Sequence, residues 1–337
     1  MAAQHAIVDG FERLNIGPPA LQVNDPYDPQ GLTVNESVEL KKEDALSALI
    51  LNLDASVNLS NKVTIAHVNG FSGQATVVIK KKKDFVESRL NEHKPHFVGI
   101  SEVKNAGPDG EAGILQLLQD GPFGYLSRQF FGNDRRTFEY LIHGWDTSKY
   151  IIEGSNGPDE NRISSAMDPG DRSPWGYGHR YIWTRLKPVD AEKTSLSPFI
   201  LVTCHMPTQE IQGITIEGAW RGLMEFIKTQ NEKGVPILLM GDTNRPWARR
   251  MPHQRQVNNI YTLQNVLGEN PYPHLALTQG APPTTTGLSH IDNFIFFYKD
   301  GEEHNDDFQR NYRVHYHRLG WTTHHVLVFE FNKSFLE

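Results

Sequence analysis

The stretch Gly241–Asn244, directly after the apolar run Val235–Met240, contains residue types that can bind a cation or activate water. The apolar run is typical of a strand buried on both faces, and Gly241 allows that strand to stop sharply. Asp242 and Asn244 lie two residues apart, so in an extended segment both side chains point the same way. Two interpretations are open: the pair converges on a ligand, or it forms an Asx turn that caps the next segment.

Polar residues of similar chemistry follow or interrupt several other predicted strands. A single residue of this kind is explained by an ordinary loop, but several at corresponding ends of a layered sheet converge on a cleft. One Asn, one Glu, two His and an Asp/Asn pair suit a site for a hard cation and a phosphodiester. The residues added to Gly241–Asn244 on this argument are Asn69, Glu102, His205, Asp292 and the doublet His324–His325.

The elements that must position these residues are strands that alternate with helices from Lys62 onward. Mixed hairpins and helical crossovers predict an α/β (α+β) fold, a four-layered αββα sandwich in which two mixed β-sheets pack face to face with helices outside. The predicted strands are Val63–Val68, Pro95–Ile100, Gly124–Phe131, Thr137–His143, Tyr181–Leu186, Pro198–Cys204, Val235–Met240, Ile291–Phe297 and Val326–Phe331. The predicted helices in this region are Thr76–His93 and Ala219–Asn231.

The chain divides near residue 60. Residues 1–60 are predicted to be a partly disordered, proline-containing extension with one helix over Glu39–Leu53, where apolar residues fall on roughly one face. Residues 61–337 form the main domain. The Gly-, Pro-, Asp- and Ser-rich insertion Gly154–His179 is expected to be a long surface loop that carries substrate contacts.

Composition sets limits on the function. The chain has 337 residues, a net charge of −7 and a single cysteine, Cys204, which excludes an intramolecular disulfide and a cysteine-based zinc cluster. The negative charge argues against a general basic surface for nucleic acid, but it leaves room for a local basic groove. The N-terminus lacks the pattern of a signal peptide, and no run reaches the roughly 18 apolar residues that cross a bilayer. We therefore expect a monomeric intracellular protein, cytoplasmic or nuclear, without a membrane span.

The order of these motifs resembles the endonuclease/exonuclease/phosphatase superfamily, and the resemblance covers about residues 62–332. Each motif is short, but together they occur in the right order at compatible spacings. The stretch Gly132–Glu139 also looks more like deoxyribonucleases than like phosphoinositide phosphatases. The motifs that carry the resemblance are His67–Gly70, Gly99–Glu102, Thr203–Pro207, Gly241–Asn244, Ser289–Asp292 and Thr322–His325.

The resemblance implies that Glu102, assisted by Asn69, holds a Mg²⁺ or Mn²⁺ ion, which neutralises charge that develops on the phosphate. It implies that Asp242 orients or deprotonates the attacking water and that Asn244 positions this water or a phosphate oxygen. The alternative for Glu102 is a carboxylate near a helix N-terminus with no ligand.

Two histidines complete the implied site. His324 contacts the scissile phosphate, with Asp292 behind it to fix its tautomer and raise its pKa. His205 is a second phosphate or leaving-group histidine, oriented by Glu139. The alternative for His205 is an imidazole at a strand end with its hydrogen bonds satisfied.

The chain departs from the superfamily pattern near its C-terminus. Where the superfamily usually has Ser-Asp-His, the chain has Thr322, Thr323 and His324, so an acidic group close to the metal is missing. The Gln usual before the metal-binding Glu is Ser101, and the aromatic usual before the first Asn is Val68. We therefore expect weaker or altered metal binding.

The substrate implied is nucleic acid or another phosphodiester. Arginine and tryptophan together can grip phosphate and stack on a base, although these residues also fit an ordinary surface balanced by acidic neighbours. The function favoured by the sequence is metal-dependent hydrolysis of phosphodiester bonds with endonuclease-like activity. The alternatives are a phosphatase or phospholipid phosphodiesterase on the same scaffold, or a repurposed member that does not hydrolyse its ligand. The predicted substrate-binding residues are Arg245, Trp247, Arg249, Arg250 and Arg180.

Overall fold

The computed structural model describes part of the chain. The described residues are 32–34, 41, 45–52, 83–84, 86–104, 110–131, 138–155, 180–191, 196–208, 216–231, 234–244, 274–276, 291–298, 312–317, 324 and 326–336.

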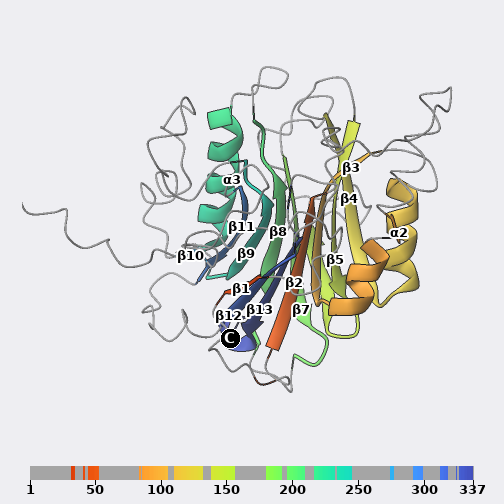
Figure 1. Ribbon diagram of the computed structural model, residues 1–337. Coiled ribbons are helices and arrows are strands. Elements are labelled where there is room, and N and C mark those ends of the chain that lie inside the picture. Colours follow the sequence, from red (N-terminus) through yellow and green to blue (C-terminus); the bar gives the residue numbers. More distant parts are fainter. Residues whose placement is uncertain are drawn as a thin grey trace, which may run out of the picture.

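Two mixed β-sheets form the centre of the molecule (Figure 1). The larger sheet has the strand order β1–β12–β13–β2–β3–β5–β4, and the smaller has the order β10–β11–β9–β8–β7–β6. The strands of the larger sheet are β1 (Leu32–Val34), β2 (Ala45–Asn52), β3 (Phe97–Lys104), β4 (Phe123–Phe131), β5 (Phe138–Asp146), β12 (Tyr312–His317) and β13 (Val326–Asn332). Those of the smaller are β6 (Tyr150–Ser155), β7 (Tyr181–Pro188), β8 (Phe199–His205), β9 (Ile237–Asp242), β10 (His274–Ala276) and β11 (Asp292–Phe297).

Helices cover the outer face of each sheet. Helix α3 (Ile216–Asn231) packs on the smaller sheet, whereas α2 (Glu111–Asp120) and a helix at residues 86–93 pack on the larger one. Figure 1 shows α2 and α3 on opposite sides of the two sheets. A short 3-10 helix, η4 (Lys333–Leu336), follows the last strand. The predicted four-layered αββα sandwich is therefore confirmed. No described helix combines the length and apolar character needed to cross a membrane.

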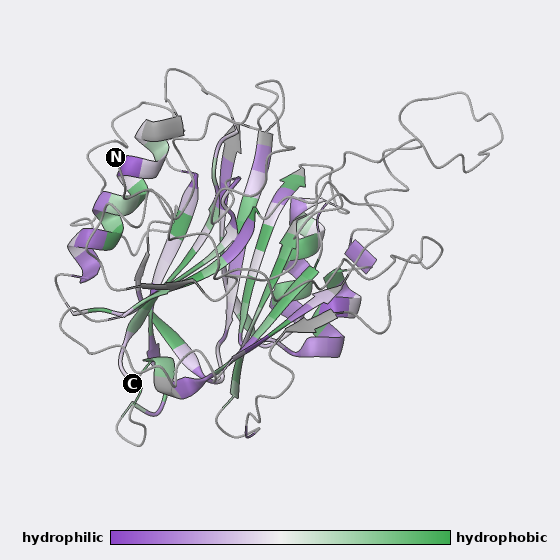
Figure 2. Cartoon of the chain, turned by 60° about the vertical axis from the view of Figure 1, so that its left-hand side comes forward, coloured by the Kyte–Doolittle hydropathy of each residue, from purple (hydrophilic) through white to green (hydrophobic). Residues whose placement is uncertain are grey.

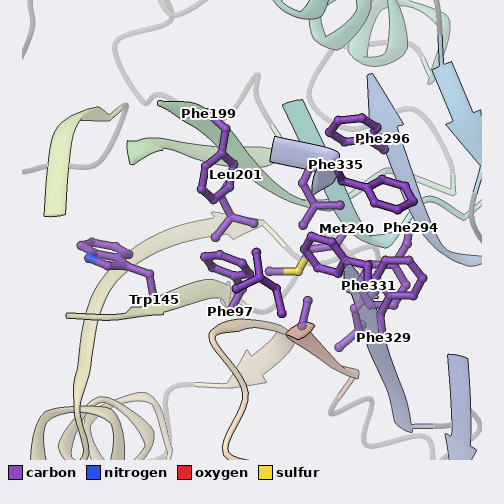
Figure 3. Packing of buried hydrophobic residues seen from close by; sticks show 14 of the residues in the cluster. Phe97, Trp145, Phe199, Leu201, Met240, Phe294, Phe296, Phe329, Phe331 and Phe335 are labelled. Carbon is purple, nitrogen blue, oxygen red and sulfur yellow. The ribbon is translucent and has the colours of Figure 1, made fainter. Parts of the chain in front are cut away.

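The main core lies between the two sheets and is rich in aromatic rings. Phe97 of β3 meets Phe199 of β8 edge to face with ring centroids 5.3 Å apart, and Phe294 of β11 stacks on Phe329 of β13 at 4.6 Å. Figure 3 shows these rings pointing toward one another from elements that are distant in the sequence. Such ring pairs add stability beyond the burial of their area, and here each one joins the two sheets.

Two further apolar clusters attach the helices. Trp220, Leu223 and Ile227 of α3 pack on the outer side chains of the smaller sheet, and Ile114 and Leu118 of α2 pack on the larger sheet. Both faces of the central strands are thus buried, which explains why they read as nearly unbroken apolar runs. In Figure 2 the strands are mainly hydrophobic, whereas the helices carry both hydrophobic and hydrophilic residues, as expected for elements with one exposed side.

Segment 45–52 corrects the sequence interpretation, because it is strand β2 and not part of a helix over Glu39–Leu53. Leu46 and Ile50 face the core between the sheets, while Leu49 and Leu51 face the helices. A strand with two buried faces has no polar side, so its apolar residues also fit a helical stripe and periodicity alone cannot separate the two.

Strand β2 also bears on the proposed division at residue 60. It lies in the middle of the larger sheet, antiparallel to β13 and parallel to β3, and β1 forms one edge of that sheet. Residues 32–34 and 45–52 therefore belong to the sandwich, so an extension ending at residue 60 is wrong for these segments.

Most other predicted elements agree with the structure. The two hairpins β4–β5 and β7–β8 are antiparallel pairs, and the predicted strands before Asp242 and after His325 are β9 and β13. The sequence analysis missed four strands, β1, β6, β10 and β12, and helix α2. The predicted strand Val63–Val68 and most of the insertion Gly154–His179 lie outside the described residues.

Each sheet contains one parallel pair, and these pairs set the position of the site. In the larger sheet β2 runs parallel to β3, and in the smaller sheet β8 runs parallel to β9. Within a pair the register brings the carboxyl ends together, with Asn52 beside Ser101 and His205 beside Asp242. Because the sheets pack face to face, polar residues at these ends can meet across the gap between them.

Gly241 is a strict backbone requirement of strand β9. Its φ is +128°, and an added Cβ lies 2.2 Å from the carbonyl oxygen of Cys204 on β8. We predict that Gly241→Ala lowers the free energy of unfolding by about 3 kcal/mol, because the backbone strain and the clash add together. Gly234→Ala is the matched control: its φ is also positive, at +68°, but nothing lies within 4 Å, and we expect a loss of about 1 kcal/mol. Equal losses in chemical denaturation contradict this account.

His143 forms a polar bridge through the inter-sheet core. It comes from β5, and its ring nitrogens contact the hydroxyls of Thr184 on β7 and, at 3.3 Å, Thr203 on β8. Burial lowers its pKa from 6.5 to about 3, so the ring is neutral in the folded protein at pH 5. The unfolded chain takes up a proton below about pH 6.5, and stability therefore falls as the pH drops from 6.5 toward 3.

We predict that His143→Gln, which keeps hydrogen-bonding groups but cannot titrate, removes part of this acid sensitivity. Between pH 6.5 and pH 5 the free energy of unfolding of the wild type should fall about 2 kcal/mol more than that of the variant. Urea denaturation at both pH values measures the difference, and parallel pH profiles for the two proteins speak against a buried neutral His143.

Candidate active site

Glu102 reaches the site because strand β3 contains a bulge. The pairing of β3 with β5 shifts register between Ile100 and Val103, and Glu102 has a left-handed backbone with φ of 56°. In a regular strand Glu102 would point to the same side as Ile100, which faces the helices. The bulge instead directs Glu102 across the gap between the sheets, where its Oε1 lies 3.3 Å from Nε2 of His205. The sequence analysis placed Glu102 after a strand end, whereas β3 continues to Lys104.

Asp242 ends strand β9 and lies between two site residues of neighbouring strands. It is in register with His205 of β8 on one side and with Asp292 of β11 on the other. Its main-chain carbonyl accepts a hydrogen bond from Met206 N at 2.8 Å. This pairing at the strand end fixes the backbone position from which the Asp242 side chain projects. The carboxylate is almost fully buried.

Asn244 confirms the Asx-turn interpretation of Gly241–Asn244. Its backbone N–H donates to Oδ1 of Asp242 at 2.8 Å, which is an Asx turn, and its φ of 50° is left-handed. Its side-chain Nδ2 donates to the carbonyl of Met206 at 2.6 Å. The turn therefore positions the carboxylate and the carboxamide rather than excluding a ligand.

The strand end at Asp242 is held by a second set of bonds to β11. Both the N–H and the hydroxyl of Thr243 donate to the carbonyl of Ile291, at 2.6 and 2.7 Å. Asn293 Nδ2 donates to the same hydroxyl at 2.8 Å. The left-handed backbone of Asn244, which costs on the order of 1–3 kcal/mol, persists because these neighbouring bonds over-determine the surrounding structure.

His324 and Asp292 form a buried ion pair. Nδ1 of His324 lies 2.8 Å from Oδ2 of Asp292, and Nε2 lies 3.9 Å from Oδ2 of Asp242. Burial by itself lowers the pKa of His324, but the charge and hydrogen bond of Asp292, with the further charges of Asp242 and Glu102, outweigh it and raise the pKa to about 10. The ring is therefore an imidazolium at neutral pH, and Nε2–H is directed toward Asp242.

Glu102, Asp242 and His324 come close enough to surround one ion. One ligand atom from each residue lies within 4.8 Å of the others, although the residues come from β3, from β9 and from just before β13. Because Nδ1 of His324 bonds to Asp292 and the ring is protonated, oxygen atoms of Glu102 and Asp242 are the available ligands. Two carboxylate oxygens suit Mg²⁺ or Mn²⁺, which complete their shells with water.

The charges of the site also fit a divalent cation. Among the described residues, four buried or nearly buried carboxylates face two cationic side chains, so the acidic groups of this part of the site are in excess by two. Burial raises the pKa of Asp242 well above its usual range, and the neighbouring charge of Asp292 raises it further. A bound cation offsets this repulsion and favours the ionised carboxylate. The acids are Glu102, Glu139, Asp242 and Asp292, and the cations are Arg180 and His324.

His205 lies opposite His324 at the end of β8 and is 2% exposed. Its Nδ1 is 3.1 Å from Nη2 of Arg180 and 3.8 Å from Oε2 of Glu139. The sequence analysis expected Glu139 to orient this ring, but the hydrogen-bonding neighbour is Arg180. Arg180 itself is 4% exposed, so it lies under the site and not on a substrate-binding rim.

The remaining predicted site residues fall outside the described part of the chain. These are Asn69, Arg245, Trp247, Arg249 and Arg250, together with Thr323 and His325.

The sequence analysis also missed a candidate for the first asparagine. It placed this residue after the strand Val63–Val68, but the strand parallel to β3 is β2, which ends at Asn52 beside Ser101. The signal was present in the apolar run that ends in Asn52, and it was lost because that run was interpreted as a helix.

Comparisons with known proteins agree on the fold. No family profile and no curated protein sequence matches the chain. Among solved structures, the human Nocturnin catalytic domain with a bound sulfate anion is 13% identical, with a TM-score of 0.51 over 90% of this chain and 97% of that one. An endonuclease/exonuclease/phosphatase protein from Bacteroides vulgatus is 15% identical, with a TM-score of 0.50 over 87% of this chain and 99% of that one. The chain therefore has the fold of the endonuclease/exonuclease/phosphatase superfamily.

We predict that Mn²⁺ stabilises the protein through Glu102. At a concentration 100 times the dissociation constant, the ion should raise the free energy of unfolding by about 2.7 kcal/mol. Glu102→Gln, which keeps the shape of the side chain but removes its charge, should abolish most of this response. The matched control is Glu92→Gln, a half-exposed glutamate that pairs with Arg89 on the helix surface. Thermal unfolding with and without Mn²⁺ measures the effect, and an equal response in all three proteins shows that the ion binds elsewhere.

Proposed function

We propose that the protein is a divalent-metal-dependent hydrolase of phosphodiester bonds. The observation that carries the proposal is the convergence of Glu102, Asp242 and His324 from three elements, with Asp292 hydrogen-bonded behind His324. This arrangement combines oxygen ligands, a carboxylate near those ligands and a cationic donor within one buried cluster. It is the combination that attack of water on a phosphate requires.

In this proposal Glu102 holds the ion, and strand β2, which ends at Asn52, takes the place beside β3 that the sequence analysis gave to the strand before Asn69. The register between β2 and β3 supports this change, because it places Asn52 beside Ser101. When bound, the ion supplies positive charge that stabilises the developing charge on the phosphate. The protein itself supplies the fixed geometry around that position.

Asp242 orients the attacking water and accepts its proton. Burial raises the pKa of this carboxylate, which makes it a better base than an exposed aspartate. Asn244 is fixed against Met206 and holds the water or a phosphate oxygen in place. A water deprotonated at Asp242 attacks phosphorus, the bond to the leaving oxygen breaks, and that oxygen takes up a proton from solvent water.

The two histidines face the phosphate from the smaller and the larger sheet. His324 is an imidazolium held by Asp292, and it donates from Nε2 to a phosphoryl oxygen. Nε2 of His205 has no hydrogen-bond partner among the described residues, although it is buried next to Glu102 and Asp242. A buried N–H in this state is stabilised by an acceptor such as a phosphate oxygen.

Within this class we propose nucleic acid as the substrate. The support is the sequence that follows Asp242, in which Arg245, Arg249 and Arg250 flank Trp247. Guanidinium groups bind phosphates and an indole stacks on bases. The relation to proteins of this fold is at the level of architecture, so the proposed substrate rests on this sequence segment and is tested by direct assay.

We predict Mg²⁺- or Mn²⁺-dependent cleavage of plasmid DNA or RNA by the purified protein, with loss of activity in a chelator. Asp242→Ala should reduce the rate about 10²-fold or more, because it removes the base. The control Asp120→Ala changes an exposed carboxylate of α2 that bonds only to Gln116 in the hydrogen bonds described, and it should leave the rate unchanged.

A panel of substrates separates the proposal from its alternatives. Cleavage of small phosphomonoesters without cleavage of nucleic acid indicates a phosphatase. No metal-dependent hydrolysis of any substrate by the wild type overturns the proposed function.

A further inference from the structure

Arg180 and His205 form a tightly bonded pair across the ends of two strands. Strands β7 and β8 are antiparallel with Tyr181 opposite Cys204, which places Arg180 opposite His205. The N–H of His205 donates to the carbonyl of Arg180 at 2.9 Å, and Nε of Arg180 donates back to the carbonyl of His205 at 2.8 Å. The third bond joins Nη2 of Arg180 to Nδ1 of His205 at 3.1 Å.

The third bond decides which nitrogen of His205 carries the proton. A guanidinium group has only donors, so the atom that it meets must be an acceptor. Nδ1 of His205 therefore presents a lone pair, and the proton of the neutral ring is on Nε2. Oε2 of Glu139 lies 3.8 Å from Nδ1, which is beyond hydrogen-bond distance and does not select the other tautomer.

The opposite edge of the ring is directed into the site. Nε2 of His205 lies 3.3 Å from Oε1 of Glu102 and 3.8 Å from Oδ2 of Asp242. The selected tautomer thus puts an N–H donor next to the carboxylates that converge on the proposed ion. Both Arg180 and His205 are more than nine-tenths buried, so solvent does not compete for this arrangement.

We propose that Arg180 is the positioning residue of His205, which it holds as the Nε2–H tautomer so that the ring donates to a phosphoryl oxygen of the substrate. Arg180 then acts through His205 and does not contact the substrate. This inference rests on the proposed function for the identity of the acceptor, but the tautomer itself does not depend on any activity. It replaces both the substrate-binding role predicted for Arg180 and the orienting role predicted for Glu139.

Arginine is suited to this position for two reasons. Nε and Nη2 lie in one rigid plane, so a single side chain can bond the carbonyl and the ring of the same residue. Its positive charge is also attracted to Glu139, Glu102 and Asp242, which opposes the cost of burying the guanidinium. A lysine keeps the charge but lacks the planar pair of donors.

The test compares Arg180→Lys and Arg180→Met with the wild type. The ¹⁵N NMR spectrum of labelled, metal-free protein reports the tautomer directly, and His205→Gln identifies the His205 signals by their loss. In the wild type we expect an unprotonated Nδ1 and a protonated Nε2. In Arg180→Lys we expect a mixture of the Nδ1–H and Nε2–H tautomers. In Arg180→Met we expect that the ring no longer prefers the Nε2–H tautomer, because no donor remains at position 180. Thermal unfolding confirms that each variant measured is folded.

Kinetics with bis(4-nitrophenyl) phosphate then separate positioning from substrate contact. We expect Arg180→Lys to lower kcat about 10-fold to 10²-fold, with KM and inhibition by inorganic phosphate changed less than about twofold. The matched control is Arg185→Lys, the same substitution on strand β7, which follows Arg180, at a half-exposed arginine paired with Glu153, and it should change neither quantity.

Two outcomes overturn the inference. A protonated Nδ1 in the wild type, or the wild-type tautomer in Arg180→Met, shows that Arg180 does not set the ring. A raised KM and weaker phosphate inhibition with unchanged kcat in Arg180→Lys indicate instead that Arg180 binds the substrate. If the wild type hydrolyses no phosphodiester, the proposed function fails, and the NMR result still decides the role of Arg180.

Discussion

The site depends on the apolar core between the two sheets, because its residues come from both of them. Glu102 belongs to the larger sheet, whereas His205 and Asp242 belong to the smaller one. Neither sheet by itself carries all three of the residues Glu102, Asp242 and His324 that could surround an ion. The aromatic contacts Phe97–Phe199 and Phe294–Phe329 fix the separation and relative position of the sheets, and this sets the distance between Glu102 and His205. Close packing of the apolar core thus fixes the positions of the polar residues in the site.

The polar cluster contains charged groups that the apolar surroundings disfavour. Burial disfavours every charge in it, as the raised pKa of Asp242 shows. The cluster is stabilised by pairing, with Asp292 against His324 and Arg180 among three carboxylates. Among the described residues of the site, two carboxylates are in excess over the cationic side chains. The same pairing orients the imidazoles, because His324 is fixed through Nδ1 by an acid and His205 is fixed through Nδ1 by a donor. The two rings therefore present N–H groups to the site for opposite reasons.

The sequence predicted much of the fold because its central strands are apolar on both faces and its hairpins are short. It failed at Ala45–Asn52 for the same reason, since a strand buried on two sides lacks the alternation that distinguishes it from a helix. That error also hid Asn52, the last residue of this strand, as a second candidate beside Asn69 for the first asparagine. The bulge at Glu102 has no sequence signature, because it depends on how β3 meets β5 in the sheet.

What the sequence determined is the chemical inventory and its order: Glu102, His205, Asp242, Asn244, Asp292 and His324 lie within or close to strands, and together they indicate phosphodiester chemistry. What the tertiary structure decided is the partner of each group. Whether His205 meets Glu139 or Arg180 depends on cross-strand register and on differences of less than 1 Å between candidate contacts. Such contacts arise from residues far apart in the chain, and hydrogen bonds are selective at that scale. The spacing of residues in a sequence carries no information at that resolution.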